Sequence, residues 1–314
     1  MQSPNRTVHV SPWLRHACDH GSVNEPNRDD MPRDAGSPYP ISVVIPAHNE
    51  EVAICRLLSA LGSAHPQVEI VVICNGCQDR TATVARSVSP RSTVHELEQP
   101  SKMKALRFGD QVAHHFPRVY VDADVTISGA SLQTLTDALT GNILASGPTR
   151  AFDTSNSSCL VRWYYEVWEQ LPQVRNGLFG RGVFAVSRQG FERLQSTAET
   201  MSDDLAFSEA FAEGERRVMP SAIAHIKAPA TLSGLMQRRV RVVTGNAQYD
   251  DQVGRHKKSV TSTTDLAGLL KGQPSLAPKM LVFLGVTIVA RWKARRFISQ
   301  GDFTTWHRDD SSRN

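Results

Sequence analysis

From residue 40 onward, short continuous apolar runs alternate with stretches in which apolar residues recur every three or four positions. The first pattern is typical of strands buried on both faces, and the second of amphipathic helices. In order, they predict a strand over 41–45, a helix over 50–61, a strand over 68–74, a helix over 80–87, a strand over 92–96, a helix over 102–114, a strand over 118–122 and a helix over 131–139. This alternation predicts an α/β fold with a mainly parallel central sheet covered by helices, whose ligands bind at the carboxyl ends of the strands.

Beyond Gly141 the alternation loosens. The pattern there predicts a strand over 143–146, an aromatic helix, a strand over 182–187 and helices after Ser202 and Thr231. The aromatic helix contains Trp163, Tyr164, Tyr165 and Trp168. Their spacing favours a buried helix face over a surface that stacks on a sugar or touches lipid.

The two ends of the chain differ from its middle. Residues 1–39 are rich in Pro, Asn, Asp and Arg without periodicity, which predicts a disordered leader. They contain no continuous apolar core of the kind a signal peptide needs, so a cytoplasmic location is expected. We therefore expect a catalytic domain over 40–247 and a helical tail over 248–314.

The longest apolar run lies in that tail, from Met280 to Ala290. Eleven helical residues extend about 16 Å, which is too short to span a bilayer. Basic residues follow the run at 291, 293, 295 and 296. Two interpretations remain open, a buried helix with a solvated end and a surface anchor that contacts anionic lipid.

Charge and cysteine content narrow the functional classes. The chain carries 35 basic and 31 acidic residues, and this balance does not favour a nucleic-acid partner. Its five cysteines are odd in number and sparse, unlike a secreted disulfide framework. Cys74 and Cys77 have the spacing of a redox or zinc half-site, but the sequence offers no second cysteine pair to complete a zinc site.

Asp122 and Asp124 end a predicted strand and are one residue apart. Alternate residues of an extended chain project to the same side, so both carboxylates lie at the ligand-binding edge of the sheet. Mg²⁺ and Mn²⁺ are commonly held by one or two carboxylates together with substrate phosphates. The pair therefore indicates a divalent metal site, although such pairs also occur in turns and helix caps.

Five further segments combine with this pair in a recognisable order. They are 46–51 after the first strand, 74–81 at the end of the second, the helix start 101–109, the acidic pair 203–204, and the basic segment 238–242. Together the six elements resemble the Rossmann-like GT-A fold of nucleotide-sugar glycosyltransferases, family 2 in particular. The resemblance covers residues 41–245.

The resemblance implies a nucleotide site. Its lining residues would be Pro46, Ala47, Asn49, Glu50, Asn75, Lys102 and Asp122, with Asn75 facing the base. Family members usually carry aspartate at Asn75 and serine at Cys77, and an amide can still accept from and donate to a base. Asp79 is either a nucleotide contact or a helix cap, and Lys102 is either a pocket cation or part of a solvated first turn.

The later elements imply the catalytic groups. By the resemblance, Asp204 is the general base that takes the proton of the acceptor hydroxyl, and Asp203 supports it. The alternative is that both only stabilise a helix start. Arg238 and Arg241 are three residues apart on a predicted helix and could bind diphosphate oxygens. Val242 stands where processive polysaccharide synthases carry tryptophan, which favours transfer of a single sugar.

The resemblance thus implies an inverting glycosyltransferase that depends on Mg²⁺ or Mn²⁺ and uses a nucleotide-sugar, with a UDP-sugar favoured. The acceptor would be a hydroxyl compound of cell-surface polysaccharide or glycolipid synthesis, with peripheral contact to an anionic membrane. One alternative is a sugar-nucleotide nucleotidyltransferase, which would need a Gly-rich basic loop after the first strand. Another is a non-catalytic membrane-surface scaffold with a decayed site.

Overall fold

The computed structural model describes residues 40–62, 67–196, 203–254 and 260–300. The predicted leader over 1–39 lies outside the described residues, and so does the end of the predicted tail over 301–314. The predicted boundary between residues 247 and 248 falls inside one continuous helix, α9 (Leu232–Gln252).

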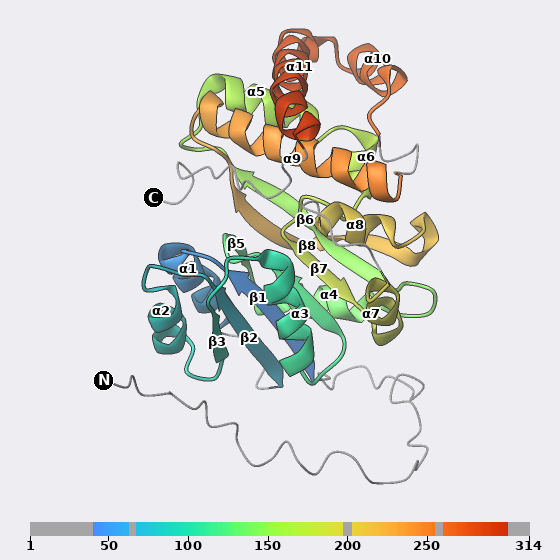
Figure 1. Ribbon diagram of the computed structural model, residues 1–314. Coiled ribbons are helices and arrows are strands. Elements are labelled where there is room, and N and C mark those ends of the chain that lie inside the picture. The colour runs from blue at the N-terminus through green and yellow to red at the C-terminus, as the bar shows by residue number, and fades with distance from the viewer. Residues whose placement is uncertain (1–39, 63–66, 197–202, 255–259, 301–314) are drawn as a thin grey trace, which may run out of the picture. The chain divides into compact units, whose positions relative to one another are not determined.

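The core of the chain is an eight-stranded mixed sheet (Figure 1). Its strand order is β3-β2-β1-β4-β7-β6-β8-β5. The strands are β1 (Ile41–Ala47), β2 (Val68–Asn75), β3 (Thr93–Leu97), β4 (Arg118–Val121), β5 (Val125–Ile127), β6 (Ala145–Asp153), β7 (Val183–Val186) and β8 (Arg216–Lys227). The strands β1 to β4 run parallel to one another, and β6 is parallel to β8. Antiparallel pairs join β7 to β4 and β6, and β5 to β8. The predicted α/β class is confirmed.

Both faces of the sheet are covered, which explains why every residue of β1 is buried. Val43 and Ile45 pack in one core with α1 (Glu51–Leu61), α2 (Thr81–Val88) and α4 (Gly129–Asp137). Val44 points to the other face and packs in a second core with α3 (Lys102–Val112). Two further helices, α7 (Arg188–Leu194) and α8 (Asp203–Glu209), contribute side chains to this second core.

Two strands were not predicted from the sequence. β5 has only three residues, too few for a periodic signal. β8 contains Pro220, which argues against a strand interior, and its inward positions near the carboxyl end are mostly alanine. The register between β6 and β8 also shifts at Pro148 and Thr149, so neither strand shows a clean alternation.

The C-terminal helices pack on one another. α11 (Ala277–Ser299) contacts both α5 (Cys159–Trp168) and α9. Short helices α6 (Pro172–Asn176) and α10 (Thr263–Gly272) lie beside them, as Figure 1 shows. The core that these helices share includes Tyr164, Tyr165 and Phe283. The aromatic helix therefore does contribute a buried face, although Trp168 is only half-buried.

The apolar run from Met280 to Ala290 is the middle part of a longer helix. The helix does not end with the apolar residues but continues through Arg291 and the basic positions that follow, for 23 residues in all. Among the described residues, Pro274–Ser299 is the one segment that is long and apolar enough to cross a membrane by length and composition. Only 28% of its most apolar 18-residue stretch is buried, so one face of the helix packs on the protein and the other is exposed.

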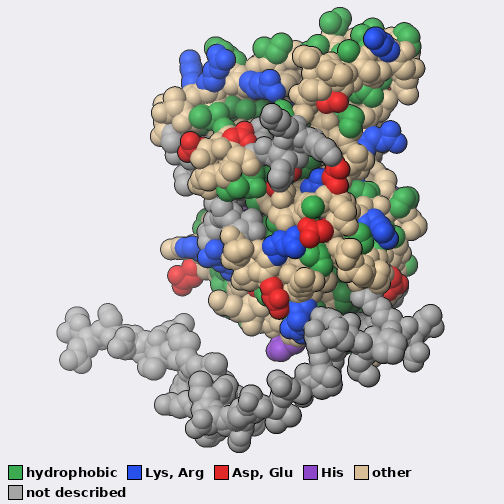
Figure 2. Space-filling view, turned by 90° about the vertical axis from the view of Figure 1, so that its right-hand side faces the viewer, with side chains coloured by type: hydrophobic (Ala, Val, Ile, Leu, Met, Phe, Trp, Pro, Cys, Tyr) green, Lys and Arg blue, Asp and Glu red, His purple; other side chains and the backbone are tan. Residues whose placement is uncertain are grey.

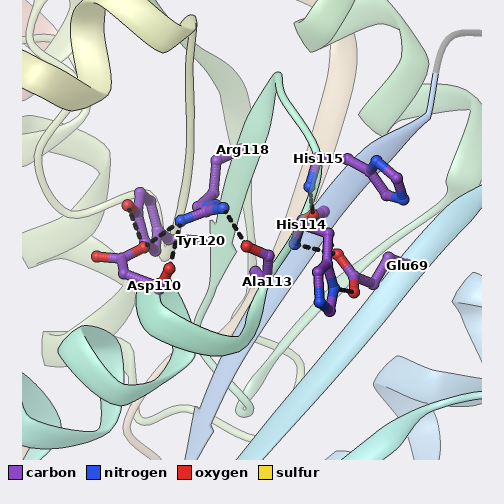
Figure 3. Close-up of polar contacts among 8 residues, drawn as sticks. Glu69, Asp110, Ala113, His114, His115, Arg118 and Tyr120 are labelled. Atoms are coloured by element: carbon purple, nitrogen blue, oxygen red, sulfur yellow. Dashed lines mark hydrogen bonds and ion pairs between the residues drawn. The ribbon is translucent and has the colours of Figure 1, made fainter. Parts of the chain in front are cut away.

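A buried charge cluster stabilises the amino end of β4 (Figure 3). Arg118 is 2% exposed and donates to Oδ1 of Asp110 at 3.1 Å and to the carbonyl of Ala113 at 2.8 Å. Tyr120 donates to the same Asp110 oxygen at 2.9 Å. Burial raises the pKa of Asp110, and the bonds from Tyr120 and Arg118 act against that rise. Because an unpaired buried charge is costly, these contacts hold α3 against the sheet.

Glu69 makes a second set of contacts at this end of the sheet (Figure 3). One carboxylate oxygen contacts the His114 ring at 2.6 Å, and the other accepts from the His114 N–H and the Ser42 hydroxyl. These bonds fix the connection between α3 and β4. The carboxyl ends of the same strands lie at the opposite edge of the sheet, where a cavity is found.

Candidate active site

A cavity of about 860 Å³ lies at the carboxyl ends of β1, β2 and β4. This volume is near the upper end of the range of small-molecule sites. Nine of the residues predicted from the sequence line it: Pro46, Glu50, Asn75, Lys102, Asp122, Asp124, Asp204, Arg238 and Arg241. Segments more than 190 residues apart in the sequence are thus brought to one place, as an open α/β sheet requires.

The side chain of Asn75 joins three segments at the cavity wall. It is 4% exposed, donates to the Ala47 carbonyl at 2.9 Å and accepts from the Ser101 N–H at 3.0 Å. Aspartate could not make the first of these bonds, because a carboxylate has no donor. Gly76 follows with φ of 60°, and a Cβ there would lie 2.7 Å from the Pro100 nitrogen. Asn75 therefore sets the distance between β1 and the start of α3.

Three predicted site residues connect the loops after β1 and β2. Asn49, at a φ of 52°, accepts from the Gln78 N–H at 2.7 Å. Asp79 accepts from the Thr81 N–H at 3.0 Å and from the Glu51 N–H at 3.2 Å. Burial raises the pKa of Asp79, but these hydrogen bonds outweigh it, so that the pKa is lowered. Asp79 thus holds the starts of α1 and α2, while Ala47 supplies a carbonyl to Asn75.

Cys77 also connects the loops after β1 and β2. Its sulfur accepts from the Asn49 N–H at 3.4 Å and lies 3.5 Å from the Ala47 carbonyl oxygen. A hydrogen bond from Cys74 lowers the pKa of the Cys77 thiol to about 6, while the pKa of Cys74 is raised. Within the described ranges, no group of three or more His, Cys, Asp or Glu residues could hold a metal ion.

Asp122 lies just beyond β4 and forms an ion pair with Lys102. The Lys102 Nζ is 2.7 Å from Oδ1 of Asp122. Lys102 starts α3, whose N-cap is the Ser101 side chain, so the helix start aims this cation into the cavity. The Asp122 N–H donates to the Gly182 carbonyl at 2.8 Å, which fixes the backbone beneath the carboxylate. Asp124 is exposed at the same cavity.

Asp204 is held in place by two backbone donors. Its Oδ2 accepts from the Gly180 N–H at 2.6 Å, and its Oδ1 accepts from the Leu205 N–H at 2.8 Å. The first bond comes from the turn before β7 and the second from α8 itself. The carboxylate is therefore pre-oriented at the cavity rather than free to rotate. α8 begins at Asp203, whose side-chain surroundings lie outside what the structure describes.

Arg238 and Arg241 enter the cavity from α9, one turn apart. Burial and the charge of Arg238 lower the pKa of Arg241, while Asp124, Asp204 and Asp122 act in the opposite direction. The two arginines and three aspartates are thus within electrostatic range of one another. Arg239 also lines the cavity, and its guanidinium lies 5.8 Å from the Tyr164 ring centre.

The turn over residues 177–182 positions both Asp122 and Asp204 through backbone hydrogen bonds. This turn was not singled out from the sequence. A Cβ at Gly182, where φ is 63°, would lie 2.3 Å from a methyl of Val125. The buried Arg181 donates to the carbonyls of Pro148, Arg175 and Gly177, and so fixes the turn from below. The three glycines at 177, 180 and 182 were the sequence feature from which this turn could have been predicted. His48, whose ring lies 2.5 Å from the Asn75 carbonyl oxygen, lines the cavity and was also missed.

The charges at this edge suit a diphosphate ligand. Guanidinium groups bind phosphate oxygens in pairs, and a lysine at a helix start adds a further cation. Asp122 and Asp124 have the hard oxygen donors that Mg²⁺ and Mn²⁺ prefer, and two carboxylates suffice where substrate phosphates complete the coordination. The residues present therefore fit a divalent ion that binds together with a nucleotide.

Comparison with known sequences finds a family match within part of the chain. Residues 42–175 match the family model described as "Glycosyl transferase family 2". A stretch of 62 residues is 37% identical to the 4,4'-diaponeurosporenoate glycosyltransferase of Staphylococcus haemolyticus. That stretch is 20% of this chain and only 16% of the length of that relative.

Solved structures of similar fold cover more of the chain. The mannosyltransferase PcManGT from Pyrobaculum calidifontis, in complex with GDP-Man and Mn²⁺, superposes with a TM-score of 0.57 at 16% identity, over 87% of this chain and 82% of that one. Glucosyl-3-phosphoglycerate synthase from Mycobacterium tuberculosis gives a TM-score of 0.48 at 18% identity, over 72% and 80%. Residues 42–175 accordingly match a glycosyltransferase family 2 domain, and the chain has the GT-A fold.

Proposed function

We propose that the chain is an inverting, metal-dependent glycosyltransferase that moves one sugar from a nucleotide-sugar, a UDP-sugar in the first instance, to a hydroxyl of its acceptor. The observation that carries the proposal is the gathering of Lys102, Arg238 and Arg241 with the carboxylates of Asp122, Asp124 and Asp204 in one cavity. The cations suit the donor diphosphate. The fixed Asp204 carboxylate suits an incoming hydroxyl.

The proposed reaction is a single displacement. The acceptor oxygen forms a bond to the anomeric carbon of the donor sugar as the bond from that carbon to the diphosphate breaks. Asp204 receives the hydroxyl proton, which needs no strong base because the proton becomes acidic as the new bond forms. Arg238 and Arg241 donate to the diphosphate oxygens on which negative charge grows. Attack from the side opposite the leaving group inverts the anomeric carbon.

Asp122 and Asp124 would hold the divalent ion. When bound, such an ion supplies positive charge that stabilises the leaving diphosphate. Lys102, at 2.7 Å from Asp122, keeps that carboxylate paired and adds a cation to the same side of the donor. Lys102 and the ion held by Asp122 and Asp124 would therefore together balance the negative charge of the donor diphosphate.

The stereochemistry of donor hydrolysis tests the proposal without knowledge of the acceptor. Water can replace the acceptor slowly, so the native protein with Mn²⁺ should release free sugar from an α-linked nucleotide-sugar. Proton NMR in the first minutes should show the β-anomer before mutarotation mixes the two. If the α-anomer appears first, the single displacement is contradicted.

A role in cell-surface polysaccharide or glycolipid synthesis would place the protein at the membrane, and α11 offers the surface for it. Its outward side chains Leu281, Ile288 and Trp292 are 73%, 64% and 60% exposed. Exposed basic residues follow at the end of the helix. Figure 2 shows hydrophobic and basic side chains together at the top, where Figure 1 has α10 and α11. We propose peripheral contact with anionic lipid through this face.

Sedimentation with lipid vesicles tests this contact. The native protein should bind vesicles that contain anionic lipid and bind neutral vesicles less. Salt at 0.5 M should release it, because the Debye length falls from about 10 Å at 0.1 M to about 3 Å at 1 M and the charge attraction is screened. Replacing Ile288 and Trp292 with glutamate should abolish binding, whereas Arg91→Glu, at an exposed site outside α11, should not. Equal sedimentation with neutral and anionic vesicles would contradict the charge contribution.

A further inference from the structure

The cavity does not end at the donor-binding residues. It continues between α5, α6, α10 and α11, where it is lined by Phe152, Trp168, Phe179, Leu266 and Leu284. We call this part the chamber. All five side chains are half-buried, and all pack against the core shared by the C-terminal helices. The chamber thus adds these apolar side chains, with polar neighbours that include Gln173, Thr263 and Thr287, to a site whose other end is charged.

This arrangement has a physical consequence. Half-buried aromatic and aliphatic side chains leave apolar surface in contact with water, at a cost of about 25 cal/mol for each Å² that an apolar ligand would cover. A nucleotide-sugar can stack its base or a sugar face on an aromatic ring, but it has no aliphatic chain to cover the surface of Leu266 and Leu284. The chamber is therefore suited to a different molecule from the donor.

The position of the chamber identifies that molecule as the acceptor. Asp204 and Leu205 line the same continuous cavity as Trp168 and Phe179. Gly180, which donates to the Asp204 carboxylate, directly follows Phe179 in the turn before β7. A hydroxyl at Asp204 would therefore have the chamber beside it.

We propose that the acceptor is an amphiphile whose hydroxyl-bearing head lies at Asp204 and whose apolar chain lies in the chamber. The identity of the head as acceptor rests on the proposed function. Binding of the chain does not, because it depends only on the chamber walls. The proposal specifies a substrate class, a hydroxyl compound with an apolar chain, in place of a wholly polar sugar acceptor.

A homologous series of alkyl glucosides measures the chain contribution directly. Methyl, hexyl, octyl and decyl β-glucoside, each below its micelle concentration, would be titrated calorimetrically into the full-length native protein. Each buried methylene should lower Kd about fourfold, the equivalent of about 0.8 kcal/mol per buried CH₂. If methyl and decyl glucoside bind equally, the proposal is overturned.

Matched substitutions on one helix locate the chain. Leu284 faces the chamber, whereas Leu281 is 73% exposed on the outward side of α11. Leu284→Gln should remove the dependence on chain length, and Leu281→Gln should keep it. If Leu281→Gln instead removes the dependence and Leu284→Gln keeps it, the chain binds the outer face and the proposal fails.

A second variant guards against misfolding. Leu266→Gln lies on α10, a helix that has no fully buried residue, so this change is well tolerated structurally. It should weaken decyl glucoside binding as Leu284→Gln does, with an unchanged melting temperature. If it leaves decyl glucoside binding at the native level, the chamber is not the chain site.

Titration of the same proteins with nucleotide separates the two proposals. Chain-length dependence in a protein that binds no nucleotide would contradict the proposed function and support the chamber. Nucleotide binding with no chain-length dependence would support the proposed function and contradict the chamber as the chain site.

Discussion

Asp204→Asn is expected to lower sugar transfer by about 10²–10⁴-fold, the usual contribution of general acid–base catalysis, while nucleotide binding persists. An amide cannot take the hydroxyl proton. The asparagine has one side-chain oxygen, so only one of the Gly180 and Leu205 N–H groups keeps its acceptor. Initial rates of nucleoside diphosphate release and calorimetric titration with nucleotide would measure the two effects separately.

The control for this prediction is Asp251→Asn. Asp251 is exposed near the end of α9, and the substitution makes the same change of charge. It should transfer sugar at the native rate. Native transfer by Asp204→Asn would remove Asp204 from the role of base, and a parallel loss of nucleotide binding would show that the residue acts on binding instead.

Asp124→Ala is expected to remove the metal-dependent part of nucleotide binding. Substitutions outside the metal ligands already cost about 10–100-fold in metal affinity, so the loss of a ligand should cost at least as much. Asp124 is a better choice than Asp122, because Asp122 also forms the ion pair with Lys102 at 2.7 Å. Asp124 is exposed, so the variant should fold normally.

The measurement is the Kd of the nucleotide with and without Mn²⁺. For the native protein, Mn²⁺ should tighten binding, and for Asp124→Ala the two values should agree. Asp137→Asn, in an exposed position on α4, serves as the matched control and should behave like the native protein. An undiminished Mn²⁺ effect in Asp124→Ala would place the ion elsewhere.

The first half of the fold could be predicted because its signals are local. β1 and β2 read as continuous apolar runs since helices cover both faces of the sheet, and the intervening helices show clear periodicity. The carboxyl ends of parallel strands must meet at one edge, so the sequence could also indicate that Asn75 and Asp122 lie near each other. Their shared cavity agrees with that expectation.

The finer roles within that edge depend on partners far along the chain. The Asn75 amide is engaged by Ala47 and Ser101, and the Asp79 carboxylate by Glu51 and Thr81. No spacing rule reveals such contacts, because they arise only when two loops pack together. A residue type that suits a ligand suits a loop connection equally well.

The second half of the fold gave weaker signals for a different reason. β8 has small inward residues and a proline, and the turn that positions Asp204 depends on Arg181 donating to the carbonyls of Pro148, Arg175 and Gly177. α11 was taken as short because its basic end was counted as a flank, whereas charged side chains are tolerated on its exposed side. The chamber arises only where the C-terminal helices pack beside β6 and the turn before β7.

Calorimetric titration of the native protein with UDP, GDP, dTDP and CMP, each with and without Mn²⁺, tests the central claim most directly. The account predicts that one of these nucleotides binds, that Mn²⁺ tightens its binding, and that Asp124→Ala abolishes the Mn²⁺ effect. Binding of none of them, or binding that is the same with and without Mn²⁺, would contradict the claim that this edge of the sheet holds a nucleotide-sugar together with a divalent ion.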